Sequence, residues 1–202
     1  MDRQSQYQKI VDDIRQHHCS LRAGCSQAVP GEGSIDSPVV FIGEGPGKVE
    51  DELGRPFVGP AGKLLAEALS QIGWQRDEVY ITNVVKCRPP DNRDPLPEEV
   101  AEHRPFLEAE LALIKPRLIV LLGRHALHWF LPNLQISQVH GTAKRIGDRV
   151  FFPVYHPAAA LYDPRLRATF LADISKIPLV LSKLTEASVT VSPTSSIQTS
   201  IF

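Results

Sequence analysis

The sequence has few cysteines and no excess of charge of either sign. Three cysteines occur in 202 residues, an odd number without the spacing of a disulfide framework, which argues against a disulfide-stapled scaffold and fits a reducing compartment. Basic and acidic residues nearly balance, and the formal net charge is -1. Any surface that binds nucleic acid must therefore be local.

Long apolar runs are absent as well. No stretch approaches the roughly 18 apolar residues of a membrane span. Because residues 1–9 are also polar, we expect neither a transmembrane segment nor a secretory signal, and we expect a cytoplasmic protein. Hydrophobic residues make up 43% of the chain, enough for one domain with a sizeable core. We expect that domain over residues 1–184 and a flexible tail, rich in serine and threonine, over residues 185–202.

What the sequence does contain is an alternation of apolar strands and helices. Strands are predicted at residues 38–43, 78–86, 117–122 and 150–155. Helices are predicted at residues 4–18, 62–72, 97–114, 125–131 and 165–184, with Pro178 kinking or splitting the last one. A hairpin-like excursion is expected around Gly141 and Gly147. This order predicts an α/β fold, a three-layer α/β/α sandwich around a mostly parallel four-stranded sheet.

A glycine-rich segment with acidic residues follows the first predicted strand. It reads Gly43-Glu44-Gly45-Pro46-Gly47, continues through Glu50-Asp51 and ends with Gly54-Arg55-Pro56-Phe57-Val58-Gly59. Glycines let backbone amides approach a ligand, carboxylates can position water, and Phe57 offers a flat face to a planar ring. Because the segment leaves the carboxyl end of a strand, we expect it to bind a ligand, and a nucleobase fits it better than a bare phosphate.

The other predicted strands also end in polar residues. Asn83 lies toward the end of the second strand, Arg124 and His125 follow the third, and His156 follows the fourth. A lone asparagine or a histidine beside a proline is more often a turn residue than a functional one. Parallel strands, however, bring their carboxyl ends to one crevice, so we expect Glu44, Phe57, Asn83 and His156 to lie within reach of one ligand.

In these motifs the chain resembles the family-four, thermostable type of uracil-DNA glycosylase. The matching segments are Gly43 to Gly59, Ala61-Gly62-Lys63-Leu64-Leu65, Tyr80 to Pro90, and His156-Pro157 with the leucine that follows. They span most of residues 16–180. The resemblance implies a monofunctional DNA-repair hydrolase that flips a deaminated base, chiefly uracil, out of DNA and cleaves its N-glycosidic bond, leaving an abasic site.

The resemblance also implies how the base is held. Phe57 would stack on the flipped ring, and Gly43 and Gly45 would border it. The amide of Asn83 would donate to the O4 carbonyl of uracil and accept from its ring N–H, whereas cytosine presents the opposite polarity.

The catalytic roles implied by the resemblance fall on a histidine and on acidic residues. His156 would donate a hydrogen bond to the O2 carbonyl as negative charge moves onto the departing uracil. The group that orients or activates water stays open between Glu44 and Glu50, and a carboxylate can also stabilise positive charge on the sugar.

Members of that family carry an iron–sulfur cluster on four cysteines, and those positions fall here on Gln16, Cys19, Cys87 and His103. Only two of the four are cysteine. Since a [4Fe–4S] cluster normally needs four thiolates, we expect no cofactor, with packing around Cys19, Cys87 and His103 in its place. Two alternatives stay open: a cluster with histidine ligands, and a zinc ion on these three residues and one of the two preceding histidines, His17 or His18.

Further residues are candidates for contacts with macromolecules. Lys144, Arg145 and Arg165 are expected at DNA phosphates, and residues 158–161 either enter the duplex as an apolar wedge or pack in the core. The chain ends Gln198-Thr199-Ser200-Ile201-Phe202, which resembles the peptide by which bacterial repair proteins dock onto the replication sliding clamp. We therefore expect a monomer that binds uracil-containing DNA and, through Gln198, Ile201 and Phe202, the clamp.

Two other classes of protein compete with this interpretation. The altered cysteine positions are compatible with a non-catalytic protein that binds uracil or other lesions, although Glu44, Asn83 and His156 argue against it. The glycine-rich segment alone is compatible with an unrelated nucleotide-binding α/β protein, but it lacks the Lys-Ser/Thr ending of a phosphate-binding loop and the glycine spacing of a dinucleotide site.

Overall fold

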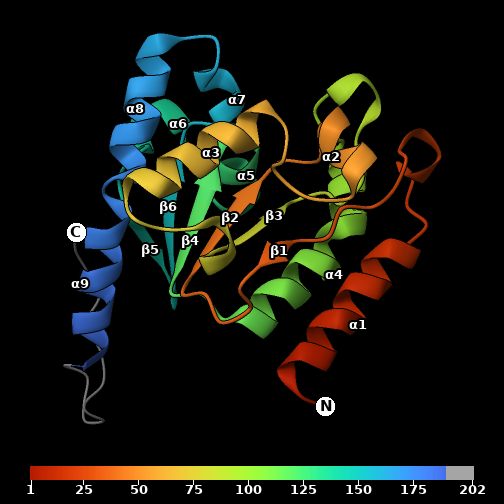
Figure 1. Cartoon of the computed structure of the whole chain (residues 1–202), viewed down its shortest axis with the longest axis horizontal. Coiled ribbons are helices and arrows are strands. Elements are labelled where there is room, and N and C mark those ends of the chain that lie inside the picture. The colour runs from red at the N-terminus through yellow and green to blue at the C-terminus, as the bar shows by residue number, and fades with distance from the viewer. Residues whose placement is uncertain (190–202) are drawn as a thin grey trace.

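A computed structural model describes residues 1–189, which fold around one six-stranded sheet of order β1-β3-β2-β4-β6-β5 (Figure 1). The four inner strands are parallel: β2 (Val39–Gly43), β3 (Tyr80–Asn83), β4 (Leu118–Leu122) and β6 (Arg149–Val154). The edge strands β1 (Glu32–Gly33) and β5 (Lys144–Ile146) pair antiparallel to their neighbours. The predicted α/β sandwich and mostly parallel sheet are confirmed.

The sheet has six strands where four were predicted, because the two edge strands were missed. They have two and three residues, too few for an alternating pattern to emerge from the sequence. The expected hairpin-like excursion corresponds to β5, which turns back onto β6. The second predicted strand was also too long, because the chain leaves β3 after Asn83 and its next two amides bond to the carbonyls of Gly43 and Glu44.

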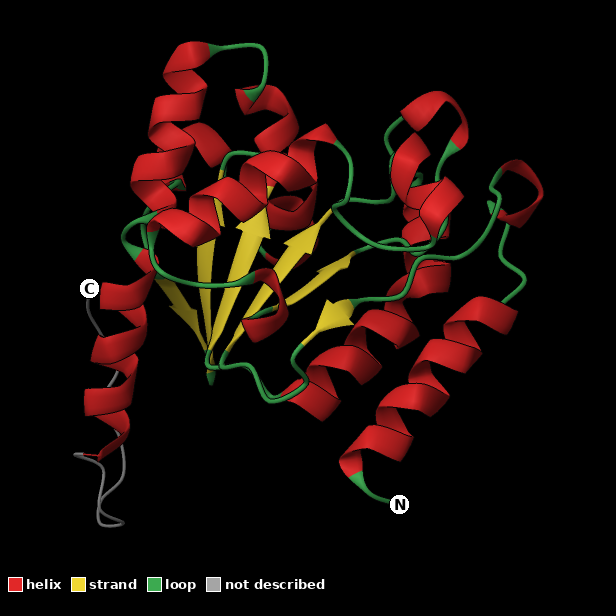
Figure 2. Cartoon of the chain, in the orientation of Figure 1, coloured by secondary structure: helices red, strands yellow, loops and turns green. Residues whose placement is uncertain are grey.

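Helices cover both faces of the sheet (Figure 2). One face carries α1 (Arg3–Gln16), α4 (Pro97–Ile114), α5 (Gly123–Phe130) and α6 (Ile136–Val139). The other carries α3 (Pro60–Gln71), α7 (Pro157–Ala160), α8 (Pro164–Ile174) and α9 (Ile177–Val189). The short helix α2 (Lys48–Leu53) lies in the glycine-rich segment, and 3-10 turns occupy Arg22–Gly24, Arg76–Glu78 and Pro90–Asn92.

The last predicted helix is split in two, as one of the two expectations for Pro178 had it. Helix α8 ends at Ile174 and α9 begins at Ile177, which places Pro178 in the first turn of α9, where its missing N–H costs nothing. Helix α9 continues to Val189, past residue 185 where the tail was predicted to begin. Within residues 1–189, no helix has the length and apolarity that crossing a membrane requires.

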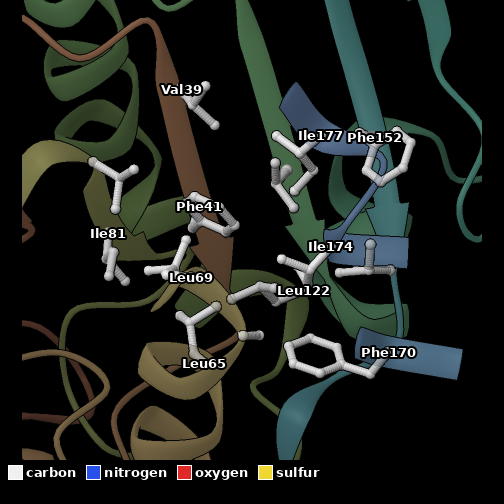
Figure 3. Close-up of a cluster of buried hydrophobic side chains, with 14 of the residues drawn as sticks. Val39, Phe41, Leu65, Leu69, Ile81, Leu122, Phe152, Phe170, Ile174 and Ile177 are labelled. Carbon is white, nitrogen blue, oxygen red and sulfur yellow. The ribbon is translucent and has the colours of Figure 1, made fainter. Parts of the chain in front are cut away.

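The core consists of two apolar layers, one on each face of the sheet. All residues of β2 and β4 are buried, as expected for parallel strands covered on both sides. On one face, side chains of β2, β4 and β6 pack against α3 and α8 (Figure 3). Each fully buried large side chain contributes about 1.5 to 3 kcal/mol relative to exposure. The two layers hold the strands rigidly, so the loops at their carboxyl ends have a fixed base.

Candidate active site

Residues at the carboxyl ends of β2, β3 and β6 line a cavity of about 340 Å³. Its lining includes six residues that the sequence singled out, namely Glu44, Gly45, Glu50, Phe57, Asn83 and His156. Its volume lies in the range of small-ligand sites, about 300 to 1,000 Å³. The structure therefore brings the predicted base-binding and catalytic residues together, while the role of each one stays a prediction.

Phe57 is held beside the cavity in an unusual backbone conformation. Its φ is +51°, a left-handed value that costs a residue with a side chain of order 1 kcal/mol and persists only where the surroundings impose it. The Arg76 guanidinium donates to the carbonyl of Phe57 at 2.8 Å and also to that of Pro56. The ring centroid lies 5.8 Å from that of His156, with 38° between the planes. Phe57 and His156 thus face one shared space.

Helix α2 contributes two carboxylates that fix the glycine-rich segment. Glu50 Oε1 accepts the backbone N–H groups of Val58 at 3.0 Å and Gly59 at 2.7 Å. The neighbouring Asp51 is buried and accepts the N–H of Ser26 at 2.8 Å, which ties the N-terminal part of the chain to α2. Because one oxygen of Glu50 already serves two amides, Glu50 is less suited to activate water than Glu44.

Gly43 gives Asn83 and Phe57 the room they occupy. The two strands pair Gly43 with Asn83, and a Cβ on Gly43 would lie 2.5 Å from Asn83 Oδ1 and 2.5 Å from Phe57 Cζ. Asn83 is only 1% exposed, and its Oδ1 has no hydrogen-bond partner among the described residues. An unsatisfied buried acceptor costs about 1 to 3 kcal/mol. A ligand N–H at this position would remove that cost.

A buried ion pair between Lys86 and Glu110 holds the backbone of Asn83 in place. Lys86 Nζ donates to the Asn83 carbonyl at 2.8 Å, to Thr82 Oγ1 at 2.7 Å and to Glu110 Oε2 at 2.7 Å. Glu110 also accepts the Gly31 N–H at 2.9 Å. Burial lowers the pKa of Lys86, while the carboxylate beside it acts in the opposite direction.

The sequence reasoning missed this network, although one signal was present. Glu110 stands on the apolar stripe of α4, three residues after Leu107 and next to Leu111, and all three side chains are buried. A charged residue at such a position needs a buried partner of opposite charge.

His156 is held as a neutral hydrogen-bond donor. Its Nδ1 accepts the N–H of Ala158 at 3.2 Å, so the ring proton resides on Nε2. Burial, with a smaller contribution from nearby His125, lowers the pKa of His156 to about 4, so the imidazole is uncharged at neutral pH. Gly123, at φ +89°, allows the close packing, since a Cβ there would lie 2.8 Å from His156 Cβ.

Glu44 lines the cavity with His156 and lies close to a second polar pair, Asp94 and His125. Burial and, to a smaller extent, the carboxylate of Asp94 raise the pKa of Glu44 to about 7 against the opposing effect of Arg124. His125 Nε2 lies 3.6 Å from Glu44 Oε2 and 3.1 Å from Asp94 Oδ1. A second cavity of about 320 Å³ is lined by Glu44, Asp94, His125 and His156. A carboxyl that titrates near neutrality beside a cavity has the properties of a general base.

Asp94 and His125 were not among the predicted site residues. The only signal for His125 was its place directly after a strand. Asp94 belongs to a proline-rich loop whose path the sequence did not reveal.

The remaining predicted residues fall into separate places. Cys19, Cys87 and His103 are buried close together, away from the cavity lining, whereas Gln16 is exposed at the end of α1. Burial, followed by contacts with Cys19 and Cys25, raises the pKa of Cys87, and burial lowers that of His103.

The residues predicted to contact DNA lie toward opposite ends of the strands. Arg165 is 92% exposed in the first turn of α8 and follows the His156 segment. Lys144 and Arg145 instead pair with Phe151 and Val150 in the first half of β6, whereas His156 follows the carboxyl end of that strand. The structure therefore does not bring Lys144 and Arg145 to the cavity.

The two expectations for residues 158–161 each hold for part of the segment. Ala158 lines the cavity and Ala160 is packed in the core at 1% exposure. Leu161 is 37% exposed, and the following Tyr162 is 90% exposed. The predicted clamp residues Gln198, Ile201 and Phe202 lie outside the described residues.

Comparisons with known proteins converge on one family. The model of the uracil DNA glycosylase superfamily matches residues 30–176. A type-4 uracil-DNA glycosylase of Archaeoglobus fulgidus is 48% identical over 169 residues, covering 79% of this chain and 84% of that protein. The enzyme of the same name from Thermotoga maritima is 44% identical over 170 residues, covering 82% of this chain and 88% of the relative. A third, from Sulfurisphaera tokodaii, is 44% identical over 169 residues, covering 79% and 77%.

Proposed function

The chain belongs to the uracil-DNA glycosylase superfamily, and from this membership we propose that it is a uracil-DNA glycosylase acting in DNA base-excision repair. It removes uracil from DNA by hydrolysing the N-glycosidic bond and leaves an abasic site. The observation that carries the proposal is the placement of Phe57, Asn83 and His156 around one cavity at the carboxyl edge of the sheet.

Base recognition rests on Phe57 and Asn83. A flipped uracil stacks on the ring of Phe57, whose backbone is fixed from both sides. The unpartnered Oδ1 of Asn83 accepts the ring N–H of uracil, and its amide N–H donates to O4. Cytosine offers an acceptor at the first position and a donor at the second, so it leaves both amide groups unsatisfied.

His156 stabilises the leaving group. As the bond between the sugar carbon and the ring nitrogen breaks, its electron pair moves onto uracil and concentrates on O2. The Nε2–H of His156 donates to that oxygen from a neutral, preorganised ring. One such donor contributes about 3 to 4 kcal/mol, on the order of a hundred- to thousand-fold in rate.

Glu44 takes the proton of the attacking water. The water adds its oxygen to the sugar carbon, which has oxocarbenium character, and its proton goes to the Glu44 carboxylate. The carboxylate also favours the positive charge that develops on the sugar. Glu50 holds Val58 and Gly59, and we assign it a positioning role on the loop that carries Phe57. The reaction itself needs no cofactor.

DNA approaches the carboxyl edge of the sheet. Leu161 and the exposed Tyr162 enter the duplex where the base leaves it, and Arg165 contacts a nearby phosphate. Lys144 and Arg145 serve, at most, phosphates farther along the duplex. Because one chain carries every residue assigned here, the enzyme acts as a monomer, and we place it in the cytoplasm with its DNA substrate. Residues Gln198–Phe202 dock onto the sliding clamp.

An excision assay tests this function directly. Oligonucleotides with a single uracil, single-stranded or paired with guanine, are incubated with the protein and treated with alkali, which nicks DNA only at abasic sites. We expect nicks with the wild type and a loss of at least about tenfold for Asn83→Ala, the effect of one buried hydrogen bond. Binding without nicking would support the non-catalytic lesion-binding alternative, and full activity of Asn83→Ala would overturn the pocket assignment.

A further inference from the structure

Two buried imidazole nitrogens lie next to a thiol on the side of the molecule where α1 meets α4. The ligand atoms of His17, Cys19 and His103 all lie within 4.8 Å of one another. His17 Nε2 and His103 Nε2 are both buried, and among the described residues neither has a hydrogen-bond partner. Two unsatisfied nitrogens in one place cost free energy unless something binds between them.

The surrounding contacts hold both imidazole rings in place. His103 Nδ1 donates to the Glu99 carbonyl at 2.8 Å, so its proton is on Nδ1 and its Nε2 is free to coordinate. Such a hydrogen bond behind a histidine is the usual support of a metal ligand. The His17 ring is fixed edge-on against Phe106, with centroids 4.8 Å apart, and against His103 at 5.8 Å.

The four-cysteine cluster implied by the family does not fit these residues. Gln16 has no thiol and is exposed, and the position of the fourth ligand carries the imidazole of His103. Two imidazoles and two thiolates instead match the tetrahedral donor set of a structural zinc ion.

We propose that His17, Cys19, His103 and Cys87 bind one zinc ion. Cys87 is 1% exposed and lies in the same buried cluster as Cys19, so we assign it as the fourth ligand. Two thiolates balance the charge of the ion and the neutral imidazoles add none, so the buried site is electrically neutral. The nearby Arg22 guanidinium donates to Cys25 Sγ at 3.6 Å and belongs to the outer surroundings of the site.

The site has a structural connection to the cavity. The segment after Cys19 leads to Ser26, whose N–H is bound by Asp51, and the adjacent Glu50 holds the loop of Phe57. Cys87 in turn precedes Pro89, which lines the cavity. An ion at this place would hold two of the loops that shape the base pocket.

Cobalt binding to the full chain tests the proposal. The protein, stripped of metal with a chelator under reducing conditions, is titrated with Co²⁺ as a visible probe. We expect saturation at about one Co²⁺ ion per chain, with the visible bands of a tetrahedral centre and a thiolate charge-transfer band. Added Zn²⁺ should displace Co²⁺ and abolish these bands. Zn²⁺ should also raise the thermal unfolding midpoint.

The variants include a matched pair of neighbouring histidines. His17→Ala and Cys19→Ser should lose the tetrahedral spectrum and the thermal shift, whereas His18→Ala, at an exposed position, should keep both. Should a variant fail to fold, the wild-type stoichiometry and charge-transfer band still decide. Absence of a thiolate band, loss of binding in His18→Ala, or a brown iron-containing protein after anaerobic purification would each overturn the zinc assignment.

Discussion

Gly43 and Asn83 face each other across β2 and β3 so closely that one added methyl group on Gly43 would meet Asn83 Oδ1 at 2.5 Å. The same methyl would press on the ring of Phe57. Position 43 therefore admits only glycine, because any larger residue would displace Asn83 and Phe57.

Gly43→Ala should consequently displace Asn83 and Phe57 from the base. We expect excision, measured as kcat/KM on a uracil oligonucleotide, to fall on the order of a hundredfold, the typical cost of misplacing a substrate by an ångström. Gly24→Ala is the control, because a Cβ there would lie 3.7 Å from Pro90 Cγ, an ordinary contact. Equal activity of the two variants would contradict the crowding argument.

His156→Ala should slow the chemical step with little change in substrate binding. We expect single-turnover rates to drop about a hundred- to a thousandfold, since the leaving anion loses its neutral donor. Because the pKa of His156 is about 4, lowering the pH from 7 to about 5 should not charge the ring. An increase in KM without a decrease in the single-turnover rate would instead indicate that His156 acts in substrate binding.

The pH profile should follow Glu44. With a pKa of about 7, Glu44 is protonated below neutrality and cannot accept a proton, so excision should increase as the pH rises through about 7. Glu44→Gln should remove this limb of the profile and lower the maximal rate.

Two neighbouring substitutions should shift that midpoint in opposite directions. The carboxylate of Asp94 raises the pKa of Glu44 and Arg124 lowers it, so Asp94→Asn should move the midpoint to lower pH and Arg124→Ala to higher pH. Profiles are measured at matched ionic strength. Identical midpoints in both variants would assign the titration to another group.

Lys86→Met should destabilise the protein strongly. It leaves the Glu110 carboxylate buried without its cation, which costs about 3 to 5 kcal/mol. Urea unfolding followed by circular dichroism measures the difference. Lys9→Met removes an exposed partner of Asp13 and should cost at most about 0.5 kcal/mol. A similar small effect at Lys86 would mean that the network does not support Asn83.

The sequence predicted those parts of the fold that rest on local pattern. Apolar runs such as Leu118–Leu122 and the capped helix Pro97–Ile114 left clear signals, and the structure has both. Helix α2 was missed because glycines at its two ends, Gly47 and Gly54, look like loop residues although they cap it. Short edge strands likewise leave no periodicity.

The site was predictable only where its residues follow strands. Asn83 is the last residue of β3 and His156 follows the end of β6 by two residues, and parallel topology brings such ends together. The Lys86–Glu110 pair and the Asp94–His125 contact join distant segments, so their meeting depends on tertiary packing that no local pattern encodes.

Helix α9 bears on how the enzyme is connected to other molecules. In Figure 1, α8 lies beside the carboxyl ends of the strands, where the cavity is, and α9 continues toward their amino ends. Helix α9 thus ends away from the cavity, so a protein bound to α9 would leave the cavity open to its ligand.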